Sequence, residues 1–342
     1  MSAGSRPSGV PATASADLVR GKAPEPPALA RILLKARPVA SQLADRLAEP
    51  WADGLELYLD KADILTLDEC RAVVERIHAA QLPENFSFVV EGPIRSLDNE
   101  YVDLTACTPA AKELVKRLGD MAVALGAEAV VMHAIVPRFT LADDDWTRRA
   151  DYLEAGMEFA QFYADTLLPL GVIPTLENVP PVLRMREGRY LFTPIGMAPE
   201  DIRWYLDRIP GLQTTLDVSH GQLYVNAWNM AQREEGDEGV QPLMNHLLHF
   251  DPIASVEQFI DVNGPDIFEV HVSNASGLLG EGARYDDGDI DMKRVIGRLA
   301  RVARYLVTET INLDEDHAEY MREAQAGMSA VIKSLQAPTG AA

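Results

Sequence analysis

The sequence predicts an α/β fold, a single-domain (β/α)8 TIM barrel, from three observations. Short apolar runs alternate with longer stretches of helical pattern, which is typical of βαβ units built around a parallel sheet. Eight such runs lie between Arg31 and Leu335, which suits a closed barrel. No glycine-rich G-x-G-x-x-G turn follows the first run. That absence argues against a doubly wound open sheet, which is the alternative fold.

The eight runs are rich in β-branched and aliphatic residues. The predicted strands are Arg31–Ala36, Gly54–Leu59, Phe86–Glu91, Ala129–Ile135, Val172–Glu177, Gln213–Asp217, Ile267–Val272 and Tyr305–Thr310. Helical patterns between them include Pro109–Leu125, Asp144–Leu170, Pro199–Arg208, Pro242–His249 and Asp291–Arg301. A closing helix is expected over Asp314–Leu335.

The two ends of the chain differ in composition from the rest. Residues 1–28 are rich in Pro, Ala, Ser and Gly and show no hydrophobic period. Such a segment buries too little apolar surface to offset the entropy of ordering, so it is predicted to be a disordered tail. Residues 337–342 are interpreted in the same way, which leaves 29–336 for the barrel.

Composition narrows the class of function. The chain has 52 acidic against 31 basic residues and a formal charge of −21, which disfavours nucleic acid as a partner. No apolar run is long enough for a membrane span, and no secretory signal is visible. The two cysteines, Cys70 and Cys107, show no metal or redox spacing. We therefore expect a cytoplasmic protein with a small-molecule substrate and no membrane partner, and we leave room for a homo-oligomer.

Four successive predicted strands carry a metal-binding type of residue at or near the end. These are Glu177, Asp217, His271 and Glu309. The carboxyl ends of the strands form the active-site face of a barrel. Buried carboxylates need a partner, and three of them converging would repel one another. A shared divalent ion, Mn²⁺, Mg²⁺, Co²⁺ or Zn²⁺, would supply that partner.

Each of these residues taken alone is more often an ordinary salt-bridged strand end, and it is the set of four that favours a metal site. Other polar clusters have simpler interpretations. His246 and His249, at helical spacing without carboxylates nearby in sequence, are expected to be structural. The acidic stretch Gly277–Asp291 is expected to be a solvated active-site loop. Arg184 and its neighbours suit either an anionic substrate or pairing with the acidic surface.

Several of these motifs carry a family resemblance. The chain resembles the xylose isomerase-like TIM barrel superfamily, in particular its sugar phosphate isomerase/epimerase branch, over roughly residues 31–335. The matching elements are Leu176-Glu177-Asn178, Asp217-Val218-Ser219-His220, His271, Gly288-Asp289-Ile290-Asp291 and Glu309. The resemblance implies that Glu177, Asp217, His271 and Glu309 bind one divalent ion. It also implies that His220 contacts the substrate or a second ion.

The resemblance further implies a metal-dependent isomerase or epimerase of a sugar or related polyol. Glu177 and Glu309 would transfer the proton next to a carbonyl, and His220 would complete the catalytic set. Substrate contacts are expected from Glu91, His133, Asn178 and Arg184.

A dehydratase, lyase or hydrolase on the same barrel is the alternative, including an endonuclease. The nuclease branch has histidines at the ends of both strands three and four, whereas here strand three ends in Glu91. A non-catalytic barrel is disfavoured because all four metal positions are filled.

Overall fold

The computed structural model describes residues 29–142, 144–184 and 190–337. The ends predicted to be disordered are residues 1–28 and 337–342. Residues 1–28 and 338–342 lie outside the described residues, and Ala337 is the last residue described. Within the described residues, no helix combines the length and apolar character that a bilayer crossing requires.

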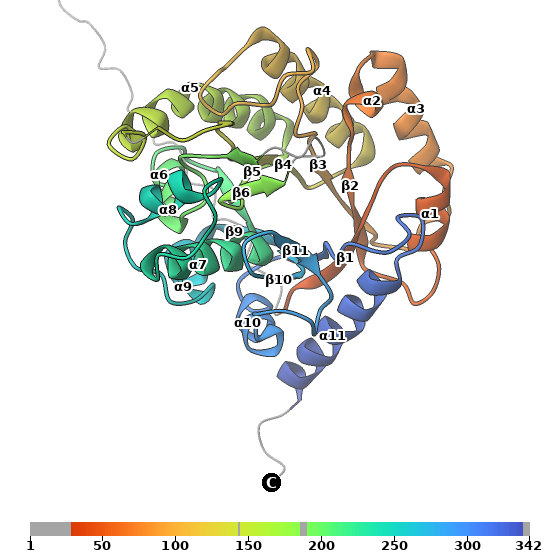
Figure 1. Cartoon of the computed structure of the whole chain (residues 1–342). Coiled ribbons are helices and arrows are strands. Elements are labelled where there is room, and N and C mark those ends of the chain that lie inside the picture. Colours follow the sequence, from red (N-terminus) through yellow and green to blue (C-terminus); the bar gives the residue numbers. More distant parts are fainter. Residues whose placement is uncertain (1–28, 143, 185–189, 338–342) are drawn as a thin grey trace, which may run out of the picture.

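Eight parallel strands close into a barrel, which confirms the predicted fold (Figure 1). Around the barrel, each strand is hydrogen-bonded to the next and the last to the first. In that order they are β1 (Arg31–Ala36), β12 (Tyr305–Thr308), β9 (Ile267–Val272), β8 (Gln213–Asp217), β5 (Ile173–Glu177), β4 (Ala129–His133), β3 (Ser87–Glu91) and β2 (Gly54–Tyr58).

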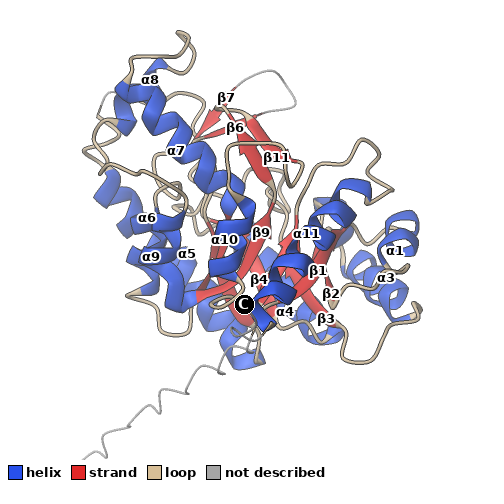
Figure 2. Ribbon diagram, turned by 90° about the horizontal axis from the view of Figure 1, so that it is seen from below, coloured by secondary structure: helices blue, strands red, loops and turns tan. Residues whose placement is uncertain are grey.

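Helices surround the barrel and cover its outer face (Figures 1 and 2). They are α1 (Ala40–Arg46), α2 (Lys61–Ile64), α3 (Leu67–His78), α4 (Pro109–Leu125), α5 (Arg149–Leu167), α6 (Pro199–Leu206), α7 (Val218–Gln232), α8 (Gln241–Leu247), α9 (Glu257–Asn263), α10 (Met292–Leu299) and α11 (Glu319–Gln336), with 3₁₀ turns at Leu168–Leu170 and Gly264–Asp266. Helix α4 shows why these segments are helical: Thr108 caps its first turn, Pro109 begins it, and Gly126 ends it with a φ of 66°.

The strand ends and the loops differ from the sequence prediction in detail. Strands β4 and β12 each end two residues early, so Glu309 is the first residue after β12. Two antiparallel hairpins were not predicted: β6 (Val182–Arg184) with β7 (Tyr190–Phe192), and β10 (Asn274–Ser276) with β11 (Gly280–Ala283). Figure 2 shows β6, β7 and β11 gathered beyond one end of the barrel strands. The acidic stretch after β9 is therefore partly a hairpin.

The barrel interior changes from apolar to charged along the strands. One buried cluster inside it is almost entirely hydrophobic and consists of Leu33, Val89, Ala129, Val131, Phe268, Tyr305 and Val307. Side chains alternate between the two faces of a strand, so the residues two positions further along also face inward. On β5, β8 and β9 these alternating positions hold Thr175 then Glu177, Thr215 then Asp217, and Glu269 then His271. The polar residues therefore gather at the carboxyl end of the barrel.

Candidate metal centre

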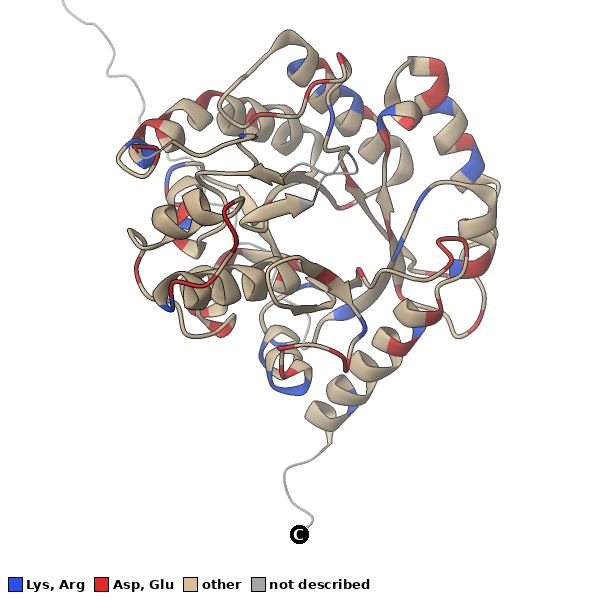
Figure 3. Cartoon of the chain, viewed as in Figure 1, with Lys and Arg blue, Asp and Glu red and all other residues tan. Residues whose placement is uncertain are grey.

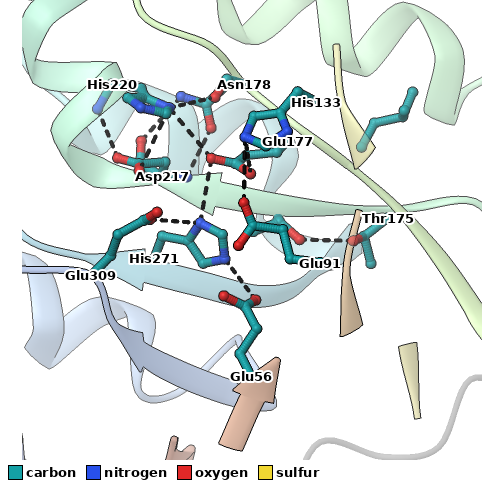
Figure 4. A network of polar contacts seen from close by, with 12 residues as sticks. Glu56, Glu91, His133, Thr175, Glu177, Asn178, Asp217, His220, His271 and Glu309 are labelled. Carbon is teal, nitrogen blue, oxygen red and sulfur yellow. Dashed lines mark hydrogen bonds and ion pairs between the residues drawn. The ribbon is translucent and has the colours of Figure 1, made fainter. Parts of the chain in front are cut away.

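The four predicted metal ligands meet at the carboxyl end of the barrel (Figure 4). Glu177 ends β5, Asp217 ends β8, His271 lies within β9, and Glu309 directly follows β12. One ligand atom from each residue lies within 4.8 Å of those from the other three. Glu177, Asp217 and His271 are buried, and the Glu309 side chain is 26% exposed. Residues up to 132 positions apart in sequence therefore form one compact donor set.

The imidazole of His271 is oriented by a carboxylate on its far side. Its Nε2 lies 2.8 Å from Glu56 Oε2, and its Nδ1 lies 2.8 Å from Glu309 Oε2 and 3.3 Å from Glu177 Oε1. If Nε2 carries the proton and donates it to Glu56, the Nδ1 lone pair faces the two carboxylates. Histidine ligands of metals in proteins typically donate their other ring N–H to a carboxylate in this way.

Several of the donor atoms also have no hydrogen bond. Both carboxylate oxygens of Glu177, Nδ1 of His271 and Oε2 of Glu309 are buried and have no hydrogen bond of acceptable geometry within the described residues. Leaving buried polar atoms unsatisfied is costly, so such atoms call for a partner. Three carboxylates and one imidazole suit a divalent ion such as Mn²⁺, Mg²⁺, Co²⁺ or Zn²⁺. The residues present therefore fit the expected ion.

Asp217 and His220 are fixed by the start of α7. The Asp217 carboxylate accepts a hydrogen bond from the backbone N–H of His220 at 2.7 Å and so caps this helix. Asn178 holds the same point from β5: its side-chain NH₂ donates to Asp217 O at 3.0 Å, and its side-chain oxygen accepts from Asp217 N at 2.9 Å. The Asn178 amide is thus engaged in positioning Asp217, and its contact with substrate stays a prediction.

His220 lies beside this set with one ring nitrogen already engaged. Its Nδ1 is 2.9 Å from the carbonyl oxygen of Asn178 and 3.4 Å from Glu177 Oε1. Its Nε2 lies 3.9 Å from Glu281 Oε2, on β11. An Nδ1–H donated to the carbonyl leaves Nε2 as the nitrogen that can meet a substrate oxygen.

Glu91 and His133 extend the centre toward β3 and β4. His133 Nε2 lies 3.5 Å from Glu91 Oε1 and 3.4 Å from Glu177 Oε2. Burial lowers the pKa of His133, which favours the neutral ring. Ligand atoms of Glu91, His133 and Glu177 form a second group within 4.8 Å of one another. Both residues therefore adjoin the predicted ligands, and their roles toward substrate stay predictions.

Lys35, on β1, is a member of the site that was not predicted. Its ammonium group contacts Glu91 and Glu309, and lies 3.4 Å from Glu56 Oε1. Burial alone would lower the pKa of Lys35, but these carboxylates outweigh burial and raise it well above the usual value. Lys35 is therefore a fixed positive charge on the β1 side of the centre.

Glu56 and Glu269 were also missed. Glu269 is buried, and its Oε1 accepts a hydrogen bond from the Thr215 hydroxyl at 3.1 Å, which in turn lies 2.8 Å from the Thr175 hydroxyl. One signal could have identified Lys35, Glu56 and Glu269. Each is a charged residue inside a mainly apolar strand, within RILLKA, GLELY and IFEVHV, and away from the first position where Arg31 stands in the first of them. A charge at such a place has no solvent to face and must lie in a polar interior.

The protonation of the carboxylates follows their neighbours. Burial would raise the pKa of Glu177, but His133 and His271 outweigh it and lower the pKa to about 2. Burial raises the pKa of Asp217 to about 8, despite the nearby His220. Burial would lower the pKa of His220, but Asp217 and Glu177 raise it to about 9. A cation between the two carboxylates would favour the ionised form of both.

The remaining predicted residues lie away from this donor set or beyond what is described. Arg184 ends β6, and its side chain lies outside the described residues, as do Arg186 and Arg189. His246 Nε2 lies 3.2 Å from the carbonyl of Pro194, and the His249 ring stacks on Trp146 with centroids 3.8 Å apart. These contacts agree with the structural role expected for both histidines.

Comparison with known proteins gives the fold. No protein-family model matches the chain, and neither does any curated protein sequence. Solved structures do match. A D-tagatose 3-epimerase-like protein shares 16% identity, covering 89% of this chain and 99% of its own, with a TM-score of 0.59. A xylose isomerase domain protein from Planctomyces limnophilus shares 12%, covering 90% and 98%, with a TM-score of 0.57.

An enzyme of a different type matches the chain with comparable identity and coverage. Endonuclease IV from Thermus thermophilus shares 17% identity, covering 88% of this chain and 99% of its own, with a TM-score of 0.51. At these identities the likeness establishes architecture and leaves the reaction open. The chain has the fold of the xylose isomerase-like TIM barrels.

Proposed function

We propose that this protein is a metal-dependent isomerase or epimerase of a sugar or related polyol, acting by proton transfer next to a carbonyl. The observation that carries the proposal is the donor set of Glu177, Asp217, His271 and Glu309, with its unsatisfied buried atoms. A divalent ion held there would supply positive charge to a carbonyl oxygen and a neighbouring hydroxyl, which acidifies the C–H bond beside the carbonyl.

The proposal assigns the proton transfer to two carboxylates. Glu177 and Glu309 come from different strands and approach His271 Nδ1 at 3.3 and 2.8 Å. A substrate between them would meet one carboxylate on each side, and one would remove the proton from the carbon beside the carbonyl. Return of a proton by the other carboxylate to the opposite face of the same carbon gives the epimer. Return to the former carbonyl carbon, with transfer of the neighbouring hydroxyl proton to the former carbonyl oxygen, gives the isomer. Nε2 of His220 would hold a substrate oxygen. Each step needs a base within hydrogen-bond reach of the proton that it takes.

The proposal is tested by isotope and kinetics together. The metal-loaded protein should be screened against keto-sugars, inososes and dehydroshikimate-like acids in D₂O. We expect deuterium at the carbon next to the carbonyl. Product without deuterium would replace proton transfer by a hydride shift or another reaction class.

Substitutions assign the roles. Glu309→Gln should lower kcat by roughly 10²-fold or more, as expected for loss of a positioned acid or base, and metal occupancy must be measured alongside. His220→Ala should raise KM more than it lowers kcat, because a substrate hydrogen bond is lost. Glu75→Gln, exposed on α3, is the control with the same change of charge. A Glu309→Gln protein that keeps both metal and full turnover would remove Glu309 from the mechanism.

A metal-dependent hydrolase, including an endonuclease, is the second candidate. The group of Glu91, His133 and Glu177 favours it, because phosphate-cleaving sites often hold two ions. Two observations weigh against it. The Lys35 ammonium already contacts Glu91, and the chain carries a charge of −21. Cleavage of abasic-site DNA by protein holding two ions would favour the hydrolase.

A further inference from the structure

A cavity of about 790 Å³ adjoins the metal centre. Lys35 and Glu309 belong both to the centre and to the cavity wall. Most of the wall comes from α1, α2, the segment after β3 and the segment after β12, and single residues of β2, β6 and α11 complete it. Small-molecule sites have volumes of roughly 300–1,000 Å³. A substrate whose reacting carbons lie at the donor set would therefore extend into this cavity.

The cavity wall is more basic than the protein as a whole. It contains five cationic residues against three acidic ones, whereas the whole chain has 52 acidic and 31 basic residues. The cationic residues are Lys35, Arg37, Arg46, Lys61 and Arg95, and the acidic ones are Asp60, Glu309 and Glu315. Acidic residues are spread over the outer helices and loops of the barrel (Figure 3). The positive balance beside the centre is thus a local property.

Three of the five cations already pair with carboxylates, Arg46 with Asp45 at 3.4 Å. Lys35 contacts Glu91 and Glu309, Arg37 lies 3.3 and 3.0 Å from Asp60 and Asp63, and Arg46 donates at 2.7 Å to the backbone carbonyls of Glu315 and Asp316. These contacts tie the wall to the barrel. Lys61 and Arg95 are the two cations of the wall that remain.

Lys61 and Arg95 are held together without a counter-charge. Both donate to Asn99: Lys61 Nζ to its side-chain oxygen at 3.2 Å, and Arg95 Nη1 to its backbone carbonyl at 3.0 Å. The Arg95 guanidinium also donates to the Tyr101 hydroxyl at 2.8 Å and lies 4.1 Å from the centroid of that ring. Neither cation forms an ion pair with a carboxylate of the described residues.

We infer that Lys61 and Arg95 bind an anionic group of the substrate, a carboxylate or a phosphate, carried away from the reacting carbonyl. This inference rests on the proposed function and names the class of substrate. Two cations that converge on Asn99 and have no carboxylate partner among the described residues form a site suited to a negatively charged group. Charge-assisted hydrogen bonds from lysine and arginine to such groups are about twice as strong as neutral ones.

The test uses three ligands with one ketohexose skeleton. D-Fructose, D-fructose 6-phosphate and D-fructuronate differ at carbon 6, which bears a hydroxyl, a phosphate or a carboxylate. Their dissociation constants should be measured by calorimetry on the metal-loaded protein. We expect at least one of the two anionic ligands to bind about tenfold or more tightly than fructose, since 1.4 kcal/mol is tenfold in affinity. Comparing the phosphate with the carboxylate shows which anion the cavity takes.

Two variants locate the effect. Lys61→Gln and Arg95→Gln should each weaken the anionic ligand about tenfold and leave fructose within about twofold. Lys116→Gln, which removes one charge from an exposed position on α4, is the control and should change neither. Circular dichroism of each variant checks that it is folded.

Three results would overturn the inference. They are equal affinity for neutral and anionic ligands, variants that weaken all three ligands alike, and an effect of Lys116→Gln as large as that of Lys61→Gln.

The inference and the proposed function fail in different ways. If neutral fructose binds and exchanges deuterium as well as the anionic ligands do, the isomerase stands and the anion site is wrong. If no ligand exchanges deuterium, but inorganic phosphate binds and both variants weaken that binding, the anion site stands and the isomerase is wrong.

Discussion

The His271 ring lies between the carboxylate of Glu56, which orients it, and those of Glu177 and Glu309, which would bind the same ion. Glu56 is fully buried, and its Oε2 lies 2.8 Å from His271 Nε2. It belongs to no cluster of possible metal ligands that contains Glu177 or Asp217. Glu56→Gln removes this orienting charge while keeping the size of the side chain. It should lower the affinity for the divalent ion by roughly 10–100-fold, as is typical for partners of metal-binding histidines.

The measurement is a competition titration against a metal-binding dye, with Glu75→Gln as the control. Because Glu56 does not itself belong to the four-residue donor set, an unchanged affinity would mean that His271 needs no orienting partner. It would weaken the assignment of His271 as a ligand.

Lys35 offers a second test at the scale of a residue. Its ammonium group is the positive charge shared by Glu56, Glu91 and Glu309. Removing one partner of a buried ion pair costs about 3–5 kcal/mol. Lys35→Met should therefore lower the Tm of the metal-free protein by several degrees. Added divalent ion should raise the Tm of the variant by more than it raises the Tm of the wild type. Lys116→Met is the matched control, and a Tm equal to that of wild type would contradict the network.

Helix α8 supplies a prediction at the scale of an element. His246 is buried there, and burial lowers its pKa. In the unfolded chain the ring titrates near its usual pKa of about 6.5, so below that pH the unfolded state takes up a proton that the folded state resists. Stability is therefore lost as the pH falls through about 6.5. His246→Gln cannot titrate and keeps a donor for the carbonyl of Pro194.

The Tm of wild type and of His246→Gln should be compared at pH 7.5 and pH 5. We expect the Tm of the wild type to fall more between pH 7.5 and pH 5 than the Tm of His246→Gln does. A difference that does not change with pH would show that His246 titrates in the fold as it does in the unfolded chain. The comparison cancels the titration of the metal centre, which both proteins share.

Strands and helices could be predicted from the sequence where their hydrophobic pattern continued over enough residues. The eight barrel strands stand out because each is a short run of β-branched or apolar residues next to helical pattern, and Asp217 is visible as both a strand end and a helix cap. The β6–β7 hairpin was missed because both of its strands have three residues, too few for a period to appear. Strands β10 and β11 are equally short, with three and four residues, and β11 lies within the stretch that was predicted as an acidic loop.

At the scale of the whole molecule, closure of the barrel decides which residues meet. The sequence placed Glu177, Asp217, His271 and Glu309 at strand ends, and the order of parallel strands was enough to bring them together. Lys35 and Glu56 come from β1 and β2, and the pairing of β1 with β12, which closes the barrel, brings them near β12 and β9. A charged residue inside each strand indicates a polar interior, but which of these charges meet there follows from three-dimensional packing.

The central claim is that these four side chains hold one divalent ion. The direct measurement is elemental analysis of protein stripped with chelator, reloaded separately with Mn²⁺, Co²⁺ and Zn²⁺, and desalted. We expect about one ion per chain for at least one metal, and loss of most of it in Glu177→Gln and Asp217→Asn but not in Glu75→Gln. No bound ion with any of the three metals, or full occupancy in both site variants, would contradict the claim.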